Sequence, residues 1–300
     1  MIGNGIPGGG DIAIGFDKNA RRGLLLVSPT ALYALALLAA PLGAIVLFSF
    51  WTQDFLTVDT TPTLNNYREA FANPLYGLLM GRSLLISGAV TVVTVLLAFP
   101  IAYYVSFYVD PRHKSLWLFL ITIPFWTSYL IRVFLWKVIL GFNGVINSSL
   151  LELGFIEEPL TFILYNANAV VITLAHAFAP FAILPIFVAL ERIDRSLLEA
   201  SRDLGEGAIR TFFRVTLPIA MPGVIGAILI VFIPTVGDYV TPRLVGGPEG
   251  AMIANRIQVE FLRLNNAPMG AALAVIAMVL VTFVSLVIVG LNRLWLGRKS

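Results

Sequence analysis

The sequence predicts an all-α, polytopic membrane protein, and two observations support this prediction. Apolar residues make up 58% of the chain and charged residues only 12%, whereas soluble domains contain about 45–50% and about 25% respectively. So few charges cannot cover a soluble globule of 300 residues, which excludes a soluble enzyme. The apolar residues also gather in six stretches, each long enough to cross a bilayer, for which about 20 residues are needed.

The six predicted transmembrane helices account for most of the chain. They cover, approximately, residues 24–50, 83–108, 116–140, 166–190, 217–236 and 269–294. Proline inside several of them, Pro124 among others, predicts kinks or breaks. The glycine-rich residues 1–20 are expected to be a disordered cytoplasmic N-terminus, and residues 21–300 a single transmembrane domain.

The distribution of lysine and arginine predicts the orientation of these helices. Thirteen of these residues fall on the side that holds both termini and the loop 191–216, and five fall on the other side. Because cytoplasmic loops carry the excess of positive charge, both termini are expected in the cytoplasm. The loop 191–216 is then the most basic cytoplasmic element.

Cysteine is absent and there are only two histidines, His113 and His176. Disulfide frameworks, thiol catalysis and zinc–thiolate sites are therefore excluded, and no metal site is expected. His176 is expected to be a packed helix residue with a local hydrogen bond.

The loop 191–218 holds ten charges, five of each sign, in a chain with few charges. Ser196 and Glu199 fit a capping box, which predicts a short helix starting near Leu197. Gly205 falls where that helix would end in a left-handed turn. A second short helix is expected over 208–216, after which Pro218 opens the next transmembrane helix. The result is a helix–turn–helix elbow, unless the segment is an ordinary solvated loop.

The spacing inside this elbow resembles the EAA motif of ABC importer permeases. That motif reads Glu-Ala-Ala, three residues, Gly, nine residues, Ile, any residue, Leu-Pro. Here Glu199-Ala200-Ser201 is followed by Gly205 and then by Val215-Thr216-Leu217-Pro218. Ser201 replaces the second alanine and Val215 replaces isoleucine, both small changes.

Further segments resemble the spermidine/putrescine branch of these permeases, and within it the first-permease type. They are residues 50–53, 124–132, 186–204 and 237–242. The resemblance extends from about residue 24 to residue 295.

This resemblance implies a MetI-like permease fold with a cytoplasmic coupling helix, located in the bacterial inner membrane. It implies half of a translocation pore for polyamines, completed by a second homologous permease. Its other partners would be a dimer of ATPase subunits and a periplasmic or extracellular substrate-binding protein, with no nucleic acid. The chain lacks the phosphate-binding pattern G-x-x-x-x-G-K-[ST], so ATP and Mg would be bound by the partner ATPase. No catalytic site and no cofactor are expected in the chain itself.

The residues implied in ATPase coupling belong to the elbow. Glu199 would cap its helix or pair with a basic ATPase residue, and Ala200 and Ser201 would keep the helix thin. Leu204 and Phe212 would be apolar knobs. The full set is Glu199, Ala200, Ser201, Asp203, Leu204, Gly205, Phe212, Leu217 and Pro218.

A substrate pathway is a separate hypothesis. Asp238 and Tyr239 would suit a cationic substrate through charge attraction and a cation–π contact, although a Gly-Asp segment is also typical of a turn. Trp126 and Tyr129 would line the path, or would simply pack. Arg132 lies inside the third predicted helix, where it either reaches the interface, forms a structural pair or belongs to the pathway.

Other functions remain open at this point. The cargo could be another small organic cation or an amino-acid-like solute. Six helices with breaks would also permit an ATP-independent secondary transporter. An intramembrane enzyme would need convergent catalytic groups, for which the predicted helices offer few ionisable residues. The elbow at 191–218 favours the ATP-driven importer.

Overall fold

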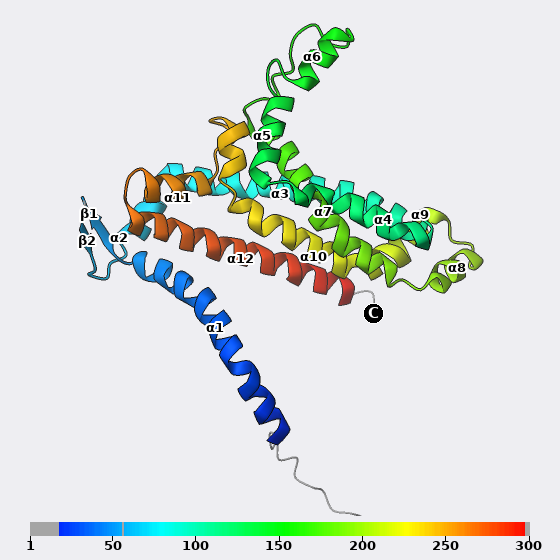
Figure 1. Cartoon of the computed structure of the whole chain (residues 1–300), viewed down its shortest axis with the longest axis horizontal. Coiled ribbons are helices and arrows are strands. Elements are labelled where there is room, and N and C mark those ends of the chain that lie inside the picture. Colours follow the sequence, from blue (N-terminus) through cyan, green and yellow to red (C-terminus); the bar gives the residue numbers. More distant parts are fainter. Residues whose placement is uncertain (1–17, 56, 298–300) are drawn as a thin grey trace, which may run out of the picture. The chain divides into compact units, whose positions relative to one another are not determined.

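The computed structural model describes residues 18–55 and 57–297 (Figure 1). The chain divides into two units, residues 1–47 and 48–300. The expected disorder of residues 1–20 falls mostly on residues 1–17, which lie outside the described residues.

Helix α1 (Lys18–Phe48) accounts for all the described residues of the first unit and ends one residue after it. Its segment Leu25–Phe48 is apolar and long enough to cross a membrane, which agrees with the first predicted helix. It contains Pro29 and Pro41 without ending at either.

The second unit begins with two short strands, β1 (Thr52–Asp54) and β2 (Thr57–Asp59), which the all-α prediction did not include. They pair antiparallel, with Thr52 opposite Asp59. Helix α2 (Asn65–Ala72) follows, and the Asn66 side-chain amide donates to the carbonyls of Ser49 (3.0 Å) and Trp51 (2.7 Å).

Four long helices form the body of this unit: α3 (Pro74–Phe107), α7 (Ala167–Glu191), α10 (Leu217–Val236) and α12 (Ala267–Gly297). All four agree with predicted transmembrane helices. Helix α3 begins nine residues earlier than expected because Asn73 caps it, accepting a hydrogen bond from the Leu75 amide (3.0 Å), and Pro74 occupies the first turn.

The core lies where α3, α7 and α10 pack together. Alanine is frequent at this interface, and small side chains let helices in a membrane approach closely. Gly223 of α10 shows how close the approach is, because a Cβ atom there would lie 2.5 Å from the Pro185 carbonyl oxygen of α7. The fully buried alanines of this core are Ala98, Ala102, Ala169, Ala182, Ala220 and Ala227.

The third predicted helix, 116–140, is not one straight helix. It consists of α4 (Pro111–Thr122) with a 3₁₀ turn (Ile123–Trp126), followed after an 88° bend by α5 (Tyr129–Ile139). Pro124 favours the break, and Thr127 and Ser128 are extended. The described residues thus contain five helices able to cross a membrane, or six when this bent pair counts as one.

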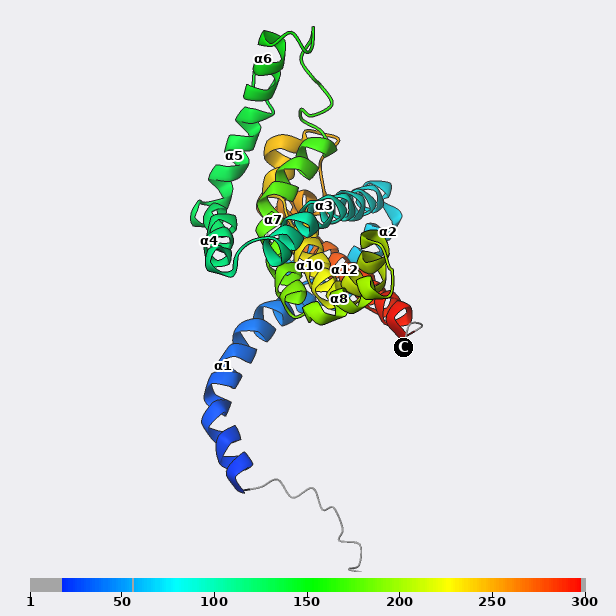
Figure 2. The same cartoon turned by 90° about the vertical axis from the view of Figure 1, so that its right-hand side faces the viewer.

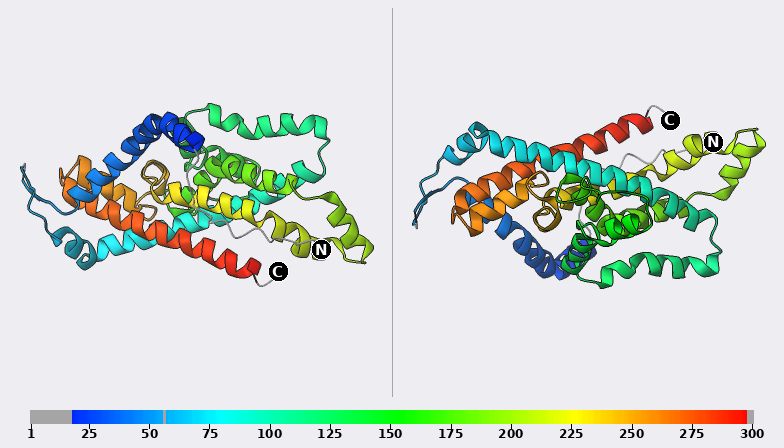
Figure 3. Two further views of the ribbon diagram at one scale, coloured as in Figure 1. Left: turned by 90° about the horizontal axis from the view of Figure 1, so that it is seen from below. Right: turned by 90° about the horizontal axis from the view of Figure 1, so that it is seen from above.

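Shorter elements complete the unit. Helix α6 (Val145–Glu152) extends from α5 away from the body, as Figure 2 shows. A π-helical turn (Pro242–Gly246) and α11 (Ile253–Leu262) connect α10 with α12. The elbow, made of α8 (Arg195–Asp203) and α9 (Ala208–Thr211), lies at the opposite end of the body from α11 (Figures 1 and 3).

Candidate functional site

The first arm of the elbow is α8, and it begins earlier than the capping-box pattern predicts. Its cap is Asp194, whose Oδ1 accepts a hydrogen bond from the Ser196 amide at 2.9 Å. The same backbone hydrogen bond holds the pKa of Asp194 below its usual value. The prediction that Ser196 caps a helix starting near Leu197 is therefore wrong, because an aspartate two positions earlier already satisfies the free amide.

Gly205 forms the turn that ends α8, as predicted. Its φ of +80° lies in the left-handed region. The Gly205 amide donates to the Arg202 carbonyl (2.8 Å), and the Glu206 amide donates to the Ser201 carbonyl (3.1 Å). This pair of bonds is the Schellman motif, which satisfies the last carbonyls of a helix.

The two arms of the elbow are tied together by polar contacts. The hydroxyls of Ser201 in α8 and Thr211 in α9 are hydrogen-bonded at 2.9 Å, and both residues are buried. Glu206 and Arg214 form an ion pair across the turn. Ser201 therefore points into the elbow, whereas Ala200 is exposed.

The exposed surface of the elbow combines acidic and apolar side chains. Glu199 and Asp203 are exposed, and so is Leu204, at 84%. Ile209 and Phe213 are also exposed, at 76% and 56%. We call Leu204, Ile209 and Phe213 the apolar tip.

Phe212 does not belong to the apolar tip. Its ring packs edge-on against Phe99 (5.4 Å between centroids) and Tyr103 (6.2 Å) of α3. The expectation of an outward knob at this position is replaced by an internal contact. Neighbouring Phe213 is the exposed ring of the two, and its centroid lies 5.0 Å from that of Phe212.

Leu217 and Pro218 form the start of α10, and they lie inside a longer helical stretch. The stretch runs from Ala208 to Val236 and includes a π-helical turn, Phe212–Thr216. A proline normally disrupts the turn before it, and the wider π turn directly precedes Pro218. Pro218 therefore stands in the first turn of α10, as predicted, although the helical stretch runs into it without a break from the elbow.

Two of the four predicted pathway residues meet in the body of the unit. The Tyr129 hydroxyl, at the start of α5, donates to Asp238 Oδ2 at 2.7 Å and lies 2.7 Å from the Thr241 hydroxyl. Asp238 Oδ1 accepts from the Val240 amide at 3.0 Å, so the aspartate also closes a turn after α10. A half-buried carboxylate thus lies directly beside the break between α4 and α5.

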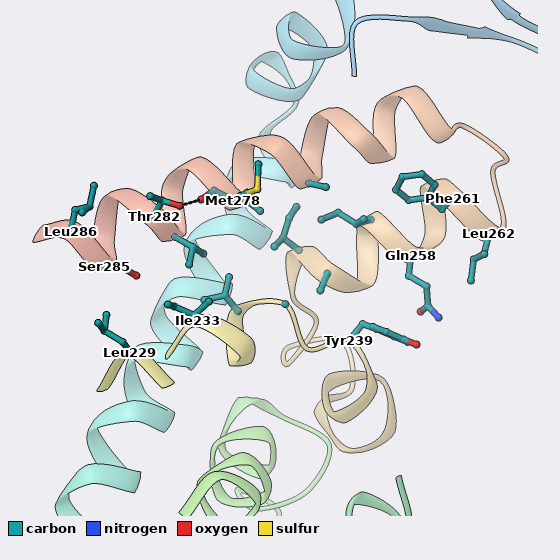
Figure 4. Close-up of a pocket in the computed structure, with 18 of the residues that line it drawn as sticks. Leu229, Ile233, Tyr239, Gln258, Phe261, Leu262, Met278, Thr282, Ser285 and Leu286 are labelled. Carbon is teal, nitrogen blue, oxygen red and sulfur yellow. Dashed lines mark hydrogen bonds between the residues drawn. The ribbon is translucent and has the colours of Figure 1, made fainter. Parts of the chain in front are cut away.

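Trp126 and Tyr239 lie apart from this pair. Trp126 is exposed, with its ring edge-on to Phe119 at 6.1 Å. Tyr239 helps to line a mainly apolar cavity of about 760 Å³ between α10, α11 and α12, and it lies at the edge of this cavity near Gln258 (Figure 4).

His176 and Arg132 differ in their polar contacts. His176 Nδ1 accepts a hydrogen bond from Trp136 Nε1 at 3.1 Å, so its partner comes from α5 rather than from its own helix. Arg132 is half-buried, and two of its nitrogens have no hydrogen-bond partner among the described residues. Residues 18–55 and 57–297 contain no cluster of three or more metal-ligating side chains.

One buried charge was missed in the sequence. Glu260 of α11 is only 2% exposed, pairs with Arg256 (2.6 Å) and accepts a hydrogen bond from the Tyr76 hydroxyl (3.2 Å). The i, i+4 spacing of Arg256 and Glu260 was a visible signal for the ion pair. No sequence signal pointed to the hydrogen bond with Tyr76, which is 184 positions away.

The bundle of long apolar helices and the elbow agree with the class of protein that the family match defines, a transporter permease. The family model for the inner membrane component of binding-protein-dependent transport systems matches residues 71–296, and the chain belongs to this family. The spermidine/putrescine transport system permease protein PotB of Haemophilus influenzae is 39% identical over 252 residues, covering 84% of this chain and 87% of that protein.

Solved structures agree on the fold. A bacterial alginate ABC transporter, in complex with an alginate-bound periplasmic protein, has a chain that matches with a TM-score of 0.70 at 17% identity. The match covers 92% of this chain and 96% of that one. The MetNI methionine ABC transporter matches with a TM-score of 0.52 at 17% identity, covering 73% and 93%. The predicted MetI-like permease fold is thereby confirmed.

Proposed function

We propose that the chain is a permease subunit of an ATP-driven importer for polyamines. The observation that carries this proposal is the elbow, in which the spacing from Glu199 to Pro218 coincides with a left-handed turn at Gly205. A loop that only connected two helices would not need both a Schellman motif and an exposed apolar tip. In an ATP-independent transporter there would be no ATPase subunit for this elbow to bind.

In this proposal the elbow binds an ATPase subunit on the cytoplasmic side. The apolar tip would enter a groove of the ATPase, while Glu199 and Asp203 would face its basic residues. Apolar burial is the main source of affinity here, since an exposed ion pair contributes only about 0–1 kcal/mol. ATP and Mg bind to the ATPase dimer, and this chain carries no cofactor.

The same proposal includes a second homologous permease, which completes the pore, and a substrate-binding protein outside the membrane. Both termini and the elbow are cytoplasmic, in agreement with the charge distribution. Residues 21–300 act as one transmembrane domain in the bacterial inner membrane, and residues 1–20 as a cytoplasmic extension.

Polyamine transport is supported by the relative from Haemophilus influenzae and by the chemistry of Asp238. A carboxylate at a break inside the membrane attracts a di- or polycation more strongly than it would in water, because the surroundings have a low dielectric constant. Tyr129 holds this carboxylate in place by its hydrogen bond. Another small organic cation would satisfy the same chemistry, and an amino-acid-like solute would do so through its ammonium group.

The experiment is gentle purification of the tagged chain from its native membrane, followed by mass spectrometry. We expect an ATPase and a homologous second permease in the eluate, and ATP hydrolysis stimulated by putrescine or spermidine with the binding protein. Recovery of the chain alone, under detergents that preserve other importers, would contradict the proposal.

The substrate is tested with Asp238→Asn, which keeps the side-chain size but removes the charge. We expect putrescine uptake to fall by about tenfold or more, the effect typical of a lost charge-assisted contact. Tyr129→Phe is the matched control for the hydrogen bond, and it should reduce uptake less because the carboxylate charge remains. Unchanged uptake by Asp238→Asn would exclude this carboxylate from the pathway.

A further inference from the structure

The C-terminal end of α3 is where the elbow is attached to the body. Ser106, one residue before the end of α3, is 1% exposed. Its hydroxyl donates to Glu191 Oε1 at 2.6 Å, and its carbonyl accepts from Arg195 Nη2 at 3.1 Å. Glu191 is the last residue of α7 and Arg195 the first of α8. The two residues that bracket the start of the elbow therefore bind the same residue of α3.

A fourth side chain completes this cluster. Lys114 of α4 donates to Glu191 Oε1 (2.6 Å) and to the Ser106 carbonyl (2.7 Å). The carbonyls in the last turn of a helix lack helical partners and carry partial negative charge, so two cations are well placed there. We call Ser106, Lys114, Glu191 and Arg195 the latch.

The second arm of the elbow contacts the same helix by a different chemistry. Phe212, directly after α9, packs edge-on against Phe99 and Tyr103. Both ends of the elbow thus hold the last three turns of α3, one by charged hydrogen bonds and one by aromatic contacts.

The opposite end of α3 is attached to the segment 248–260. The Ser83 hydroxyl accepts the Ile253 amide at 2.8 Å, and Arg82 donates to the Pro248 carbonyl at 2.8 Å. These contacts lie at the far end of the body from the elbow (Figures 1 and 3). Ser83 and Ser106 are 23 positions apart, which is about 35 Å along a helix.

We propose that the latch transmits movement of the elbow into α3, and through α3 to the segment 248–260. This route is separate from the covalent continuation of the elbow into α10. It rests on the proposed function, because an ATPase must supply the movement. Glu191, Lys114 and Arg195 are positioning residues in this scheme, since they touch neither substrate nor nucleotide.

The sequence contains no cysteine, so spin labels can be attached only at cysteines that are introduced for the experiment. Spin labels are placed by Glu249→Cys, next to the segment held by α3, and Leu153→Cys, beyond α6; both side chains are exposed. The complex with its ATPase is reconstituted, and the distance between the labels is measured by double electron–electron resonance with and without ATP. Uptake of putrescine per ATP hydrolysed is measured in parallel.

The latch is opened by Glu191→Gln with Arg195→Gln, and separately by Arg195→Gln alone in case the double variant does not fold. Arg192→Gln is the matched control, because Arg192 is an exposed neighbour outside the latch. We expect the latch variants to lose the ATP-dependent distance change and to transport about tenfold less per ATP, a typical size for coupling between sites. The control should behave as the wild type, and Lys114→Arg should retain coupling because it keeps the charge.

A wild-type distance change and wild-type coupling in a folded latch variant would overturn the proposal. Failure of the proposed function has a different signature, since no ATPase would then accompany the wild-type chain. A latch variant that hydrolyses ATP but does not move the labels supports the route through α3.

Discussion

Replacing Gly205 by valine is the sharpest perturbation of the elbow. A Cβ atom at Gly205 would meet no atom within 4 Å, so there is no clash, and the whole effect comes from the backbone φ of +80°. A residue with a Cβ atom in the left-handed region costs about 1–2 kcal/mol, and a β-branched residue costs more. A cost of this size reduces the population of the turn by about 5- to 30-fold.

The same elbow contains a matched control. Gly207 also has open space around its Cβ position, but its φ is −72°, which any residue adopts. Gly207→Val therefore changes size and β-branching equally without affecting the turn. Gly205→Asn is a second control, because asparagine tolerates the left-handed conformation.

The assay is uptake of labelled putrescine at equal membrane levels, determined by immunoblot, together with co-purification of the ATPase. We expect Gly205→Val to insert normally but to lose at least about four-fifths of its uptake, while Gly207→Val and Gly205→Asn retain most of theirs. Equal uptake by the two valine variants would refute the reasoning, since it would mean that the turn is not needed for coupling.

Three further predictions concern stability. Glu260→Ala removes the carboxylate partner of Arg256, which, among the described residues, keeps only its contacts with Tyr76. It should lower the thermal unfolding midpoint of the purified chain by the equivalent of about 1–3 kcal/mol, whereas replacing both residues by leucine should recover most of this loss. The Asp194 carboxylate, whose pKa is lowered in the fold, stabilises α8 fully at a pH above its unfolded pKa of about 3.9. This stabilisation is lost as the pH falls through the lower folded pKa. A spin label on the elbow should therefore become more mobile at that low pH, whereas Asp194→Asn should show no such pH-dependent change. Ser201→Ala should cost about 1 kcal/mol of unfolding free energy by leaving the Thr211 hydroxyl unpaired, and adding Thr211→Val should restore it.

The long helices could be predicted from the sequence because a bilayer requires length and low charge, both of which are local properties. Helix α10 begins and ends at the predicted residues, 217 and 236. The turn at Gly205 was also a local property, since only glycine adopts that conformation without cost.

The features that the sequence did not reveal depend on residues far apart in the chain. Pro124 indicates a break, but the 88° angle between α4 and α5 depends on the elements that pack beside them. Tyr129 and Asp238 form a hydrogen bond across 109 positions, and no local pattern predicts that pairing. The inward position of Phe212 also cannot be predicted locally, because its partners Phe99 and Tyr103 belong to α3.

The length of α3 links the protein to the thickness of its membrane. Its 34 residues span about 51 Å, while the hydrocarbon core of a bilayer measures about 30 Å. A helix held at both ends cannot shorten, so it tilts or extends beyond the core as the lipids change. We therefore expect acyl-chain length to alter the tilt of α3, and with it the resting separation of the inner and outer faces, before any nucleotide binds.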